Sequence, residues 1–494
     1  MKRRELITGA IGAAAAAYLP SVQASTFPTE LRVITRTGGE KTLTRSEVTE
    51  FARSLKRALL QPDSPRYDAA RKVWNGMWDD KRPALIANCL DVEDVINAVN
   101  FARSHDLLVA IRGGGHSISG KSVCDGGLII DLGHMHRVRV DAQAKTVRVE
   151  GGALLSDLDL ETQAFGLVTP AGVVSHTGVG GLTLGGGIGR LMRSHGLTID
   201  SLLSVEIVTA DGQLLTASED QHSDLFWAVR GGGGNFGVIT SFEYELYPIG
   251  QEVLVGSIQY GMDEAADMFK YFFEYSENAP KEINVSMGMT IREDGTEGGF
   301  FGVTYAGGAL KNGERLIEPI LNGAKPKNKD LGLNNYIKLQ TFGDAHNAHG
   351  RNYYIKGRHV NDYDPAMIDT IMERWKHDPN RFTTMRIVRF GGAISEVAAD
   401  ATAWPHRDAM WDMEVGGSWV DDARSEQYVQ WGRDYWDALD PYIAENFYVN
   451  ELMDEGQEHV SANYGHNYPR LQRIKHRYDP QNLFRLNANI TPKA

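Results

Sequence analysis

The chain has few cysteines, little positive charge and no long apolar run. Cys89 and Cys124 are its only cysteines among 494 residues, which excludes a scaffold built on disulfides. They could form one bridge, but we expect two unpaired, buried small residues. The net charge of −13 disfavours nucleic acid and anionic membrane surfaces as partners. A chain of this length can form two or more lobes with a large core.

The first residues have the pattern of a targeting segment. Arg3 and Arg4 precede a mildly apolar, alanine-rich run, and residues 22–24 (VQA) form a small-residue cleavage site. The apolar run is too short to span a bilayer. Paired arginines with a mild core are typical of a twin-arginine signal, and an ordinary secretory signal is the alternative. We therefore expect residues 1–24 to be removed and the mature protein to be periplasmic or secreted.

The strongest local signal is a strand that leads into three glycines and a histidine. Residues 107–111 (LLVAI) are apolar and partly β-branched, and RGGGHS follows at residues 112–117. Glycines leave main-chain N–H groups uncovered, so a bulky anionic group can approach the backbone. His116 lies at the edge of this glycine cradle. We expect the cradle to hold a phosphate-bearing cofactor that is joined to His116.

The same segment matches the phosphate-binding loop of nucleotide hydrolases as a string. Residues 115–122 (GHSISGKS) fit G-x-x-x-x-G-K-[ST], and an apolar run ends at Asp131 nearby. In a true P-loop the lysine opens a helix whose N-terminus faces the phosphates. Here residues 123–127 (VCDGG) predict a turn, and Leu128 begins a new strand. The missing helix disfavours a P-loop hydrolase that uses Lys121.

Apolar periodicity predicts two lobes. A strand at 83–89, a helix capped by Asp91 and the strand at 107–111 form a β-α-β unit before the cradle, and the inner face of the helix is expected to be Val92, Val95, Ile96 and Val99. From about residue 248 to 440, strands alternate with capped helices, which predicts an α+β lobe on an antiparallel sheet. Its expected strands are 253–260, 283–291, 300–305, 385–390 and 412–420. The C-terminal tail is expected to dock on the first lobe.

Two more glycine-rich loops belong to the first lobe. They are residues 172–189 (GVVSHTGVGGLTLGGGIG) and residues 230–237 (RGGGGNFG), and the second precedes a strand. A single string of the G-x-G type is a weak signal. Three such loops in one lobe imply main chain that lies against a long, flat ligand. A dinucleotide with a ring system fits this pattern better than a mononucleotide.

These loops, together with Tyr-x-Asn at residues 448–450 and DPxNLF at residues 479–484, resemble the berberine-bridge-enzyme-like flavoproteins of the vanillyl-alcohol-oxidase superfamily. The resemblance runs from about residue 74 to residue 492. It implies an α+β, two-lobed, PCMH-type FAD-binding fold with an inserted substrate domain on an antiparallel sheet. The implied divisions are a signal at 1–24, an FAD-binding domain at 25–247, a substrate domain at 248–440 and a C-terminal return to the FAD-binding domain at 441–494.

The resemblance also implies how the cofactor is held. His116 corresponds to the histidine that forms an 8α-histidyl bond to FAD. Relatives often add a bond from a cysteine in a Gly-x-Cys segment, whereas residues 172–174 here are GVV, which implies a single attachment. The implied cofactor-binding residues are Arg112, Gly113, Gly114, Gly115, His116, Ser117, Gly172, Thr177, Gly178, Gly181, Gly186, Gly187, Val238 and Asn450.

The resemblance assigns further roles near the flavin ring. Tyr448 corresponds to the proposed catalytic base, and its pKa would have to fall from about 10 for this task. A tyrosine that only packs and binds substrate is the alternative. Thr177 occupies the position where a valine goes with oxidases and a bulkier aliphatic residue with dehydrogenases, which favours access of O₂. Trp404 and His406 belong to a motif of the substrate lobe and are candidate pocket residues.

The implied function is an exported oxidoreductase with FAD bound through one histidine. It would oxidise an alcohol, an amine or a hydroxylated natural product by hydride transfer to flavin N5, with reoxidation by O₂ to give H₂O₂. A dehydrogenase with another acceptor is the alternative, and a non-catalytic flavin- or metabolite-binding protein is a rival of another class. His134 and His136 have no further ligands along the chain, so no metal site is expected. The sequence leaves the substrate and the oligomeric state open.

Overall fold

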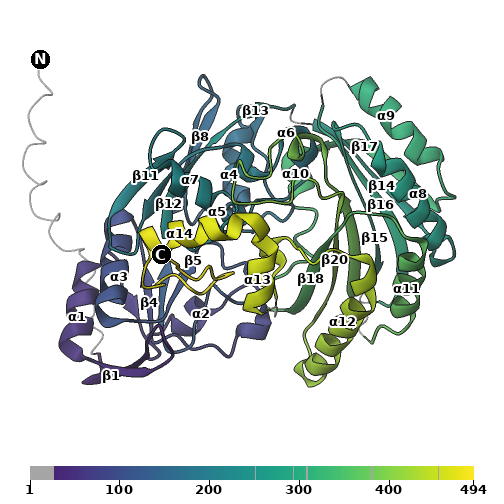
Figure 1. Cartoon of the computed structure of the whole chain (residues 1–494). Coiled ribbons are helices and arrows are strands. Elements are labelled where there is room, and N and C mark those ends of the chain that lie inside the picture. Colours follow the sequence, from purple (N-terminus) through teal and green to yellow (C-terminus); the bar gives the residue numbers. More distant parts are fainter. Residues whose placement is uncertain (1–26, 251, 293, 308–309, 380–381, 454–455) are drawn as a thin grey trace, which may run out of the picture.

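The computed structural model describes residues 27–250, 252–292, 294–307, 310–379, 382–453 and 456–494. The expected signal at residues 1–24 lies outside this range. Within it, no helix combines the length and the apolar character needed to cross a membrane. Figure 1 shows two lobes: one contains the N-terminal half of the chain and the C-terminal segment, and the other contains a large sheet backed by helices.

The predicted β-α-β unit forms a four-stranded sheet in the first lobe. Its order is β3 (Leu59–Leu60), β4 (Leu85–Asn88), β6 (Leu128–Asp131) and β5 (Val109–Arg112), with β4, β6 and β5 parallel. The side chain of Asp91 caps α3 (Val92–His105), as predicted. A turn leads from Lys121 to β6 where a P-loop would need a helix, so the prediction against a P-loop is confirmed.

The inner face of α3 differs from the prediction. Val95 and Val99 are fully buried, but Val92 and Ile96 are only half-buried. Ala98 and Ala102 complete the buried stripe instead. Small side chains allow the helix to lie close to the sheet, which turns the larger Val92 and Ile96 toward its flank.

A five-stranded antiparallel sheet completes the first lobe. Its order is β11 (Leu214–Ser218), β10 (Leu202–Val208), β12 (Val238–Glu245), β8 (Thr146–Glu150) and β7 (Val138–Asp141). The hairpin between β10 and β11 turns at Asp211 and Gly212, a residue pair typical of tight hairpin turns. Smaller elements around the two sheets are β1 (Glu30–Ile34), β2 (Glu40–Thr44), α1 (Arg45–Ser54), α2 (Tyr67–Arg71), α4 (Leu155–Gln163), β9 (Leu167–Val168), α5 (Val179–Leu184), α6 (Met192–His195), α7 (Ser223–Val229) and β13 (Tyr247–Pro248).

The second lobe is built on a seven-stranded sheet in which every pair is antiparallel, as predicted. Its order is β17 (Asn328–Asn335), β14 (Glu252–Tyr260), β16 (Glu297–Tyr305), β15 (Ile283–Ile291), β19 (Thr383–Arg389), β20 (Trp411–Trp419) and β18 (Asn352–Val360). The sequence patterns missed β17 and β18. These are the two edge strands, and polar residues interrupt the apolar pattern in both. The strand β17 is largely exposed, whereas β18 buries most of its residues, polar Asn352 and His359 among them.

The two faces of this sheet have different surroundings. Met385, Ile387 and Met413 pack into the core formed with the helices of this lobe. Arg386 and Glu414 alternate with them and therefore face the other way. Figure 1 shows the helices on the side of the sheet away from the first lobe, so the polar face is turned toward the first lobe. The helices are α8 (Ala265–Glu277), α9 (Leu310–Asn322), α10 (Tyr336–Gln340), α11 (Pro365–Lys376) and α12 (Ser425–Leu439), of which α10 lies at the lobe border.

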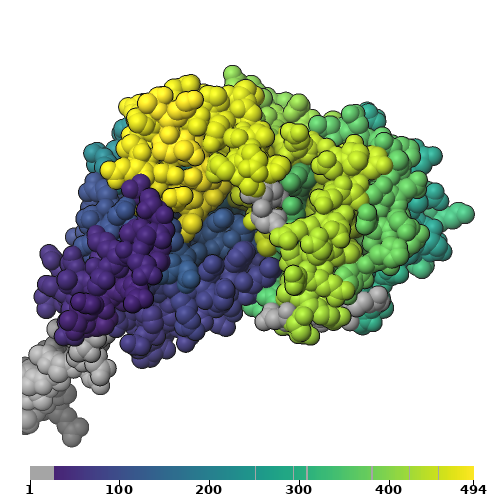
Figure 2. All heavy atoms as spheres, turned by 60° about the horizontal axis from the view of Figure 1, so that its bottom comes forward, coloured from purple at the N-terminus to yellow at the C-terminus, as the bar shows by residue number. Residues whose placement is uncertain are grey.

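The C-terminal segment docks on the first lobe, which confirms that expectation. It contains α13 (Gln457–Tyr464) and α14 (Tyr468–Tyr478), and Figure 2 shows it covering the N-terminal half of the chain beside the second lobe. Buried Lys475 donates to the carbonyl of Asn235 at 2.6 Å and pairs with Asp479, also at 2.6 Å. Cys89 and Cys124 are buried and unpaired, as expected.

Candidate active site

The glycine cradle is closed by the second glycine loop. A Cβ on Gly114 would lie 2.5 Å from the Cα of Gly178, and a Cβ on Gly178 would meet the main-chain N of Gly114. Only glycine allows the two backbones to come this close. The N–H groups of Gly114, Gly115 and His116 donate to no acceptor within the described part of the chain. Free donors beside bare backbone suit the phosphates of a dinucleotide.

Further along the second glycine loop, side chains from two other segments cover the backbone. Gly186 has φ +128°, and a Cβ there would lie 3.3 Å from Trp404 and 3.5 Å from Tyr448. The N–H of Gly187 donates to the Tyr448 hydroxyl at 3.1 Å. The structure therefore brings Trp404 and Tyr448 to the same loop as the predicted cofactor glycines. Gly181 has open space at its Cβ position.

Two other predicted cofactor residues have structural partners. The Arg112 guanidinium pairs with Asp131 at 2.6 Å, and both side chains are almost buried. Val238 is completely buried at the start of β12, within the core of the first lobe. Their side chains therefore support the loop, and any contact of Val238 with a cofactor would come from its main chain.

The remaining predicted residues are held through local contacts. The Ser117 hydroxyl accepts the N–H of Lys121 at 3.0 Å. The carbonyl of Gly172 accepts from the side chain of Gln340 in the second lobe at 2.8 Å, and the carbonyl of Thr177 accepts from Leu155 at 2.9 Å. The Thr177 side chain is half-buried beside the cradle.

His116 lies among aromatic rings that the sequence did not associate with it. Its ring stacks on Trp74 at 4.3 Å with 13° between the planes. Its Nε2 lies 2.9 Å from Nδ1 of His176, and the His349 ring lies 4.8 Å from that of His176. Burial, reinforced by the two neighbouring imidazoles, lowers the pKa of His116 to about 3. The imidazole is therefore neutral at pH 7 and keeps a nucleophilic lone pair.

Sequence reasoning missed His176 and His349. His176 had a visible signal, because it lies inside the second glycine loop, two residues after Val174. His349 had none, because it comes from the segment between α10 and β18 in the second lobe.

Tyr448 does not meet the condition that was set for a base. Its hydroxyl oxygen accepts from the N–H of Gly187 and, at 2.7 Å, from the side-chain amide of Asn450. Burial outweighs these bonds and raises the pKa of Tyr448 well above its ordinary value, and Glu451 adds to the rise. No cation in the described residues lowers it. With its oxygen engaged by two donors, the phenol can donate its own proton to a third group.

Acidic residues gather on the polar face of the seven-stranded sheet. Glu414 pairs with Arg386 on the neighbouring strand at 2.7 Å. Glu451 follows the tyrosine motif and packs against Gly357, which lies opposite Glu414 on β18. Burial, with the charges of Asp412 and Glu414, raises the pKa of Glu451 well above its ordinary value. This face presents Glu414 paired with Arg386 and, beside it, Glu451, whose protonated form is favoured and whose charge acts on Tyr448.

The two candidate pocket residues of the substrate lobe lie at different depths. Trp404 reaches Gly186 and Gly231 of the glycine loops. His406 lies behind it in an enclosed cluster, where its Nδ1 is 3.0 Å from the side chain of Asn446 and its ring is 4.9 Å from that of His359. Burial and His359 lower the pKa of His406, so it is neutral.

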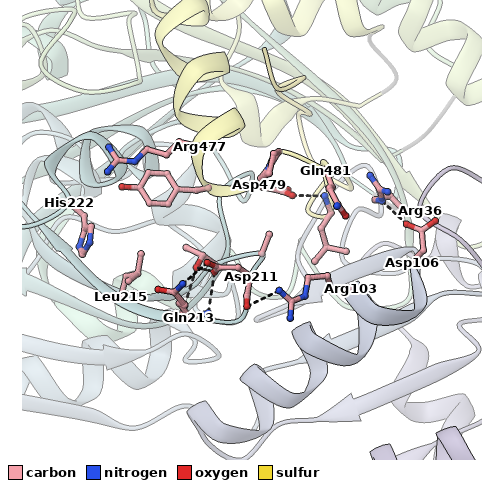
Figure 3. A pocket seen from close by; sticks show the side chains of 15 residues that line it. Arg36, Arg103, Asp106, Asp211, Gln213, Leu215, His222, Arg477, Asp479 and Gln481 are labelled. Carbon is pink, nitrogen blue, oxygen red and sulfur yellow. Dashed lines mark hydrogen bonds and ion pairs between the residues drawn. The ribbon is translucent and has the colours of Figure 1, made fainter. Parts of the chain in front are cut away.

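A pocket of about 450 Å³ opens elsewhere on the first lobe, between the C-terminal tail and the β10–β11 hairpin. Figure 3 shows Arg103 directed at the carbonyl of Asp211 and Arg36 paired with Asp106. None of the predicted site residues lines it, and these charged groups are already engaged. Across the described residues, no group of three or more His, Cys, Asp or Glu side chains is placed to hold a metal ion.

Comparisons with known proteins identify FAD-binding families and flavin-dependent oxidoreductases as similar to this chain. The family described as "FAD binding domain" matches residues 83–218, and the one described as "Berberine and berberine like" matches residues 447–491. An FAD-linked oxidoreductase of Dictyostelium discoideum is 33% identical over 90% of this chain and 97% of its own. (R)-6-hydroxynicotine oxidase of Paenarthrobacter nicotinovorans is 30% identical over 89% and 98%. The crystal structure of 6-hydroxy-D-nicotine oxidase from Arthrobacter nicotinovorans superposes with a TM-score of 0.81 at 28% identity, over 89% of this chain and 99% of that one.

Proposed function

This chain belongs to the berberine-bridge-enzyme-like FAD-linked oxidoreductases, and we propose that it is an exported enzyme that binds FAD covalently through His116 alone. The observation that carries the linkage is the placement of one neutral imidazole beside the glycine cradle. Val174 supports a single attachment because its side chain cannot bond to the flavin. The arginine pair and cleavage pattern at residues 1–24 support export to the periplasm or the medium.

The residues present fit the cofactor. The free N–H groups of Gly114, Gly115 and His116 would hold its phosphates, and the loop at Gly186, with Trp404 and Tyr448 beside it, would lie near its ring system. Asn450 would lie near the ring through its contact with Tyr448. When bound, the flavin would supply a two-electron acceptor for the hydride of a substrate C–H bond, and its reoxidation by O₂ would give H₂O₂.

The chain's own side chains handle the proton. The Tyr448 phenol, whose oxygen already accepts two bonds, would donate a hydrogen bond to the substrate oxygen or nitrogen and keep its proton. Glu414, which pairs with Arg386 at 2.7 Å, would accept the proton that the substrate releases. Glu451 would stay protonated and offer a second hydrogen bond. This distribution differs from the sequence prediction, in which Tyr448 itself was the base.

The polar face favours substrates that donate hydrogen bonds. Asp412, Glu414 and Glu451 gather three acidic side chains at this face, with Arg386 and Arg358 as neighbouring cations. Alcohols, amines and hydroxylated natural products have suitable O–H or N–H groups. The similarity to (R)-6-hydroxynicotine oxidase supports a hydroxylated nitrogen compound as the first group to test.

The linkage is tested on purified protein and on a His116→Ala variant. Wild-type protein should carry flavin fluorescence on a denaturing gel, and the variant should release all of its FAD on acid precipitation. A dark wild-type band, or fluorescence that persists in His116→Ala, contradicts attachment at His116.

The activity is tested with a panel of alcohols and amines. Without air, a true substrate bleaches the flavin, and admission of air should restore the colour with release of H₂O₂. Bleaching without peroxide release would indicate a dehydrogenase with another acceptor. A yellow protein that no compound bleaches would favour a non-catalytic binding role.

A further inference from the structure

Three histidines from distant parts of the chain meet beside the glycine cradle. His116 follows the cradle, His176 belongs to the second glycine loop, and His349 comes from the second lobe. The rings of His116 and His176 lie 4.9 Å apart, and those of His176 and His349 lie 4.8 Å apart. The proposed function uses only His116.

The contact between His116 and His176 is directional. Nε2 of His116 lies 2.9 Å from Nδ1 of His176, so the two rings share one proton in a hydrogen bond. The stacked indole of Trp74 fixes the plane of the His116 ring and with it the direction of Nε2. Because Nε2 is engaged by His176, Nδ1 is the nitrogen left to form a bond with the flavin.

One segment of the second lobe holds both rings in this arrangement. The N–H and the hydroxyl of Ser175 donate to the two carboxylate oxygens of Asp344 at 2.9 and 2.6 Å, which fixes the loop that carries His176. The indole N–H of Trp74 donates to the carbonyl of Asn347 at 2.7 Å, which fixes the ring on which His116 stacks.

We propose that His176 is the base that activates His116 while FAD is being attached, an inference that rests on the covalent linkage proposed above. Nδ1 of His116 forms a bond to the carbon of the flavin 8-methyl group, and the Nε2 proton of His116 moves to Nδ1 of His176. The methyl carbon gives up one hydrogen as a proton, and the electron pair of that C–H bond passes to O₂. With the methyl carbon written R–CH₃, the balance is R–CH₃ + H–N(His116) + O₂ → R–CH₂–N(His116) + H₂O₂. His176 then gives this proton to the reduced oxygen, where it joins the methyl proton in H₂O₂, and His176 itself is unchanged.

The surroundings explain why a base is needed there. A neutral imidazole that forms a new bond at Nδ1 becomes cationic unless it loses the proton on Nε2. A cation is costly at this site, because burial already lowers the pKa of His116 and that of the neighbouring His349. Removal of the Nε2 proton by His176 as the bond forms avoids that cost.

The rate of attachment tests this role. Full-length protein made under riboflavin limitation is given FAD in air, and covalent flavin is followed over time as fluorescence of the acid-precipitated protein. His176→Ala and His176→Gln should bind FAD reversibly but attach it at least about 100-fold more slowly than the wild type. This is the scale of general base catalysis. Added imidazole should restore part of the rate in His176→Ala. His346→Ala is the matched control, because His346 lies in the same segment as Asp344 but stacks on Phe382, and it should attach FAD at the wild-type rate.

The outcomes separate the two proposals. Attachment at the wild-type rate in either His176 variant overturns the role of His176, because an amide or no side chain would then suffice. Slow attachment in both variants without rescue by imidazole also overturns it, since His176 would then act only through structure. If His176→Ala fails to bind FAD, the rate at which His176→Gln attaches FAD tests the role of His176. Wild-type protein that binds FAD but never attaches it contradicts the covalent linkage itself.

Discussion

The two sides of the active site are made from different parts of the polypeptide. On the first lobe the site is main chain: glycines packed as closely as Gly114 and Gly178, with free N–H groups. On the second lobe it is side chain: Arg386, Glu414 and Glu451 on and around one face of a sheet. The contrast follows from what each side binds. The phosphates of a dinucleotide suit main-chain N–H groups, whereas the O–H or N–H groups of a substrate are recognised by polar side chains.

The largest loss of activity is expected when a polar side chain of the second lobe is replaced. Glu414→Gln should lower kcat by about 10²- to 10⁴-fold, because it removes the proton acceptor, while covalent flavin content stays at the wild-type level. The measurement is anaerobic flavin reduction by a substrate found in the screen. Glu373→Gln, an exposed carboxylate on α11, is the control and should reduce flavin normally. Unchanged reduction in Glu414→Gln would exclude Glu414 as the acceptor.

On the first lobe, a change at a main-chain contact should weaken the binding of FAD. Gly178→Ala forces a methyl group against the backbone of Gly114, and such overpacking costs about 1–3 kcal/mol. FAD affinity should fall roughly 5- to 150-fold by the same energy. Gly181→Ala, with open space at its Cβ position, tests whether any added methyl group in this helix has the effect. Equal FAD affinity in Gly178→Ala and wild-type protein, measured by titration of apoprotein, would contradict the close approach.

Tyr448 connects the two halves, and its removal should have a moderate effect. Tyr448→Phe loses one hydrogen bond to substrate, worth about 0.5–1.5 kcal/mol, so kcat/KM should fall several-fold. Because burial raises the pKa of Tyr448 well above its ordinary value, no titration of the phenol is expected between about pH 6 and pH 9. The pH profiles of the variant and of the wild type should therefore have the same shape. A basic limb that disappears in Tyr448→Phe would restore the tyrosine as the base.

The smallest effect concerns the border of the two lobes. Asp159 on α4 is almost fully buried, and the side-chain amide of Gln340 on α10 donates to its carboxyl group at 3.4 Å. Burial raises the pKa of Asp159 to about 7, from about 4 in the unfolded chain. A carboxyl with a raised folded pKa contributes stability below about pH 4, and that contribution is lost as the pH rises toward 7.

Replacement of this carboxyl group by an amide removes the loss of folding stability that occurs as the pH rises. Asp159→Asn should raise Tm by a few degrees at pH 8 and flatten the dependence of Tm on pH between about 4 and 7. Thermal unfolding followed by flavin release gives the measurement. Asp157→Asn, on the same helix but half-exposed and capping Leu154, should instead lower Tm slightly at both pH values. A wild-type pH dependence in Asp159→Asn would show that another group titrates.

The elements that could be predicted are those with a local cause. Asp91 caps α3 through its own side chain, and Asp211–Gly212 turns the β10–β11 hairpin, so a few adjacent residues were sufficient. The strand β17 could not be found in this way, because an exposed edge strand of polar residues has no apolar alternation. The buried face of α3 was misjudged because it depends on how closely the helix approaches its sheet.

The amino-acid sequence by itself determined the cofactor half of this protein: three glycine loops, one histidine beside them and a tail that returns to the same lobe. Backbone conformation and free N–H groups are local properties, and glycine spacing encodes them directly. Only the tertiary structure decided what surrounds His116 and Tyr448. His176, His349 and Glu414 are separated from them by tens to hundreds of residues, and hydrogen bonds, burial and the resulting pKa values depend on distance in space. For that reason the sequence predicted Tyr448 as the base, whereas the fold buries its phenol, raises its pKa and brings Glu451 beside it.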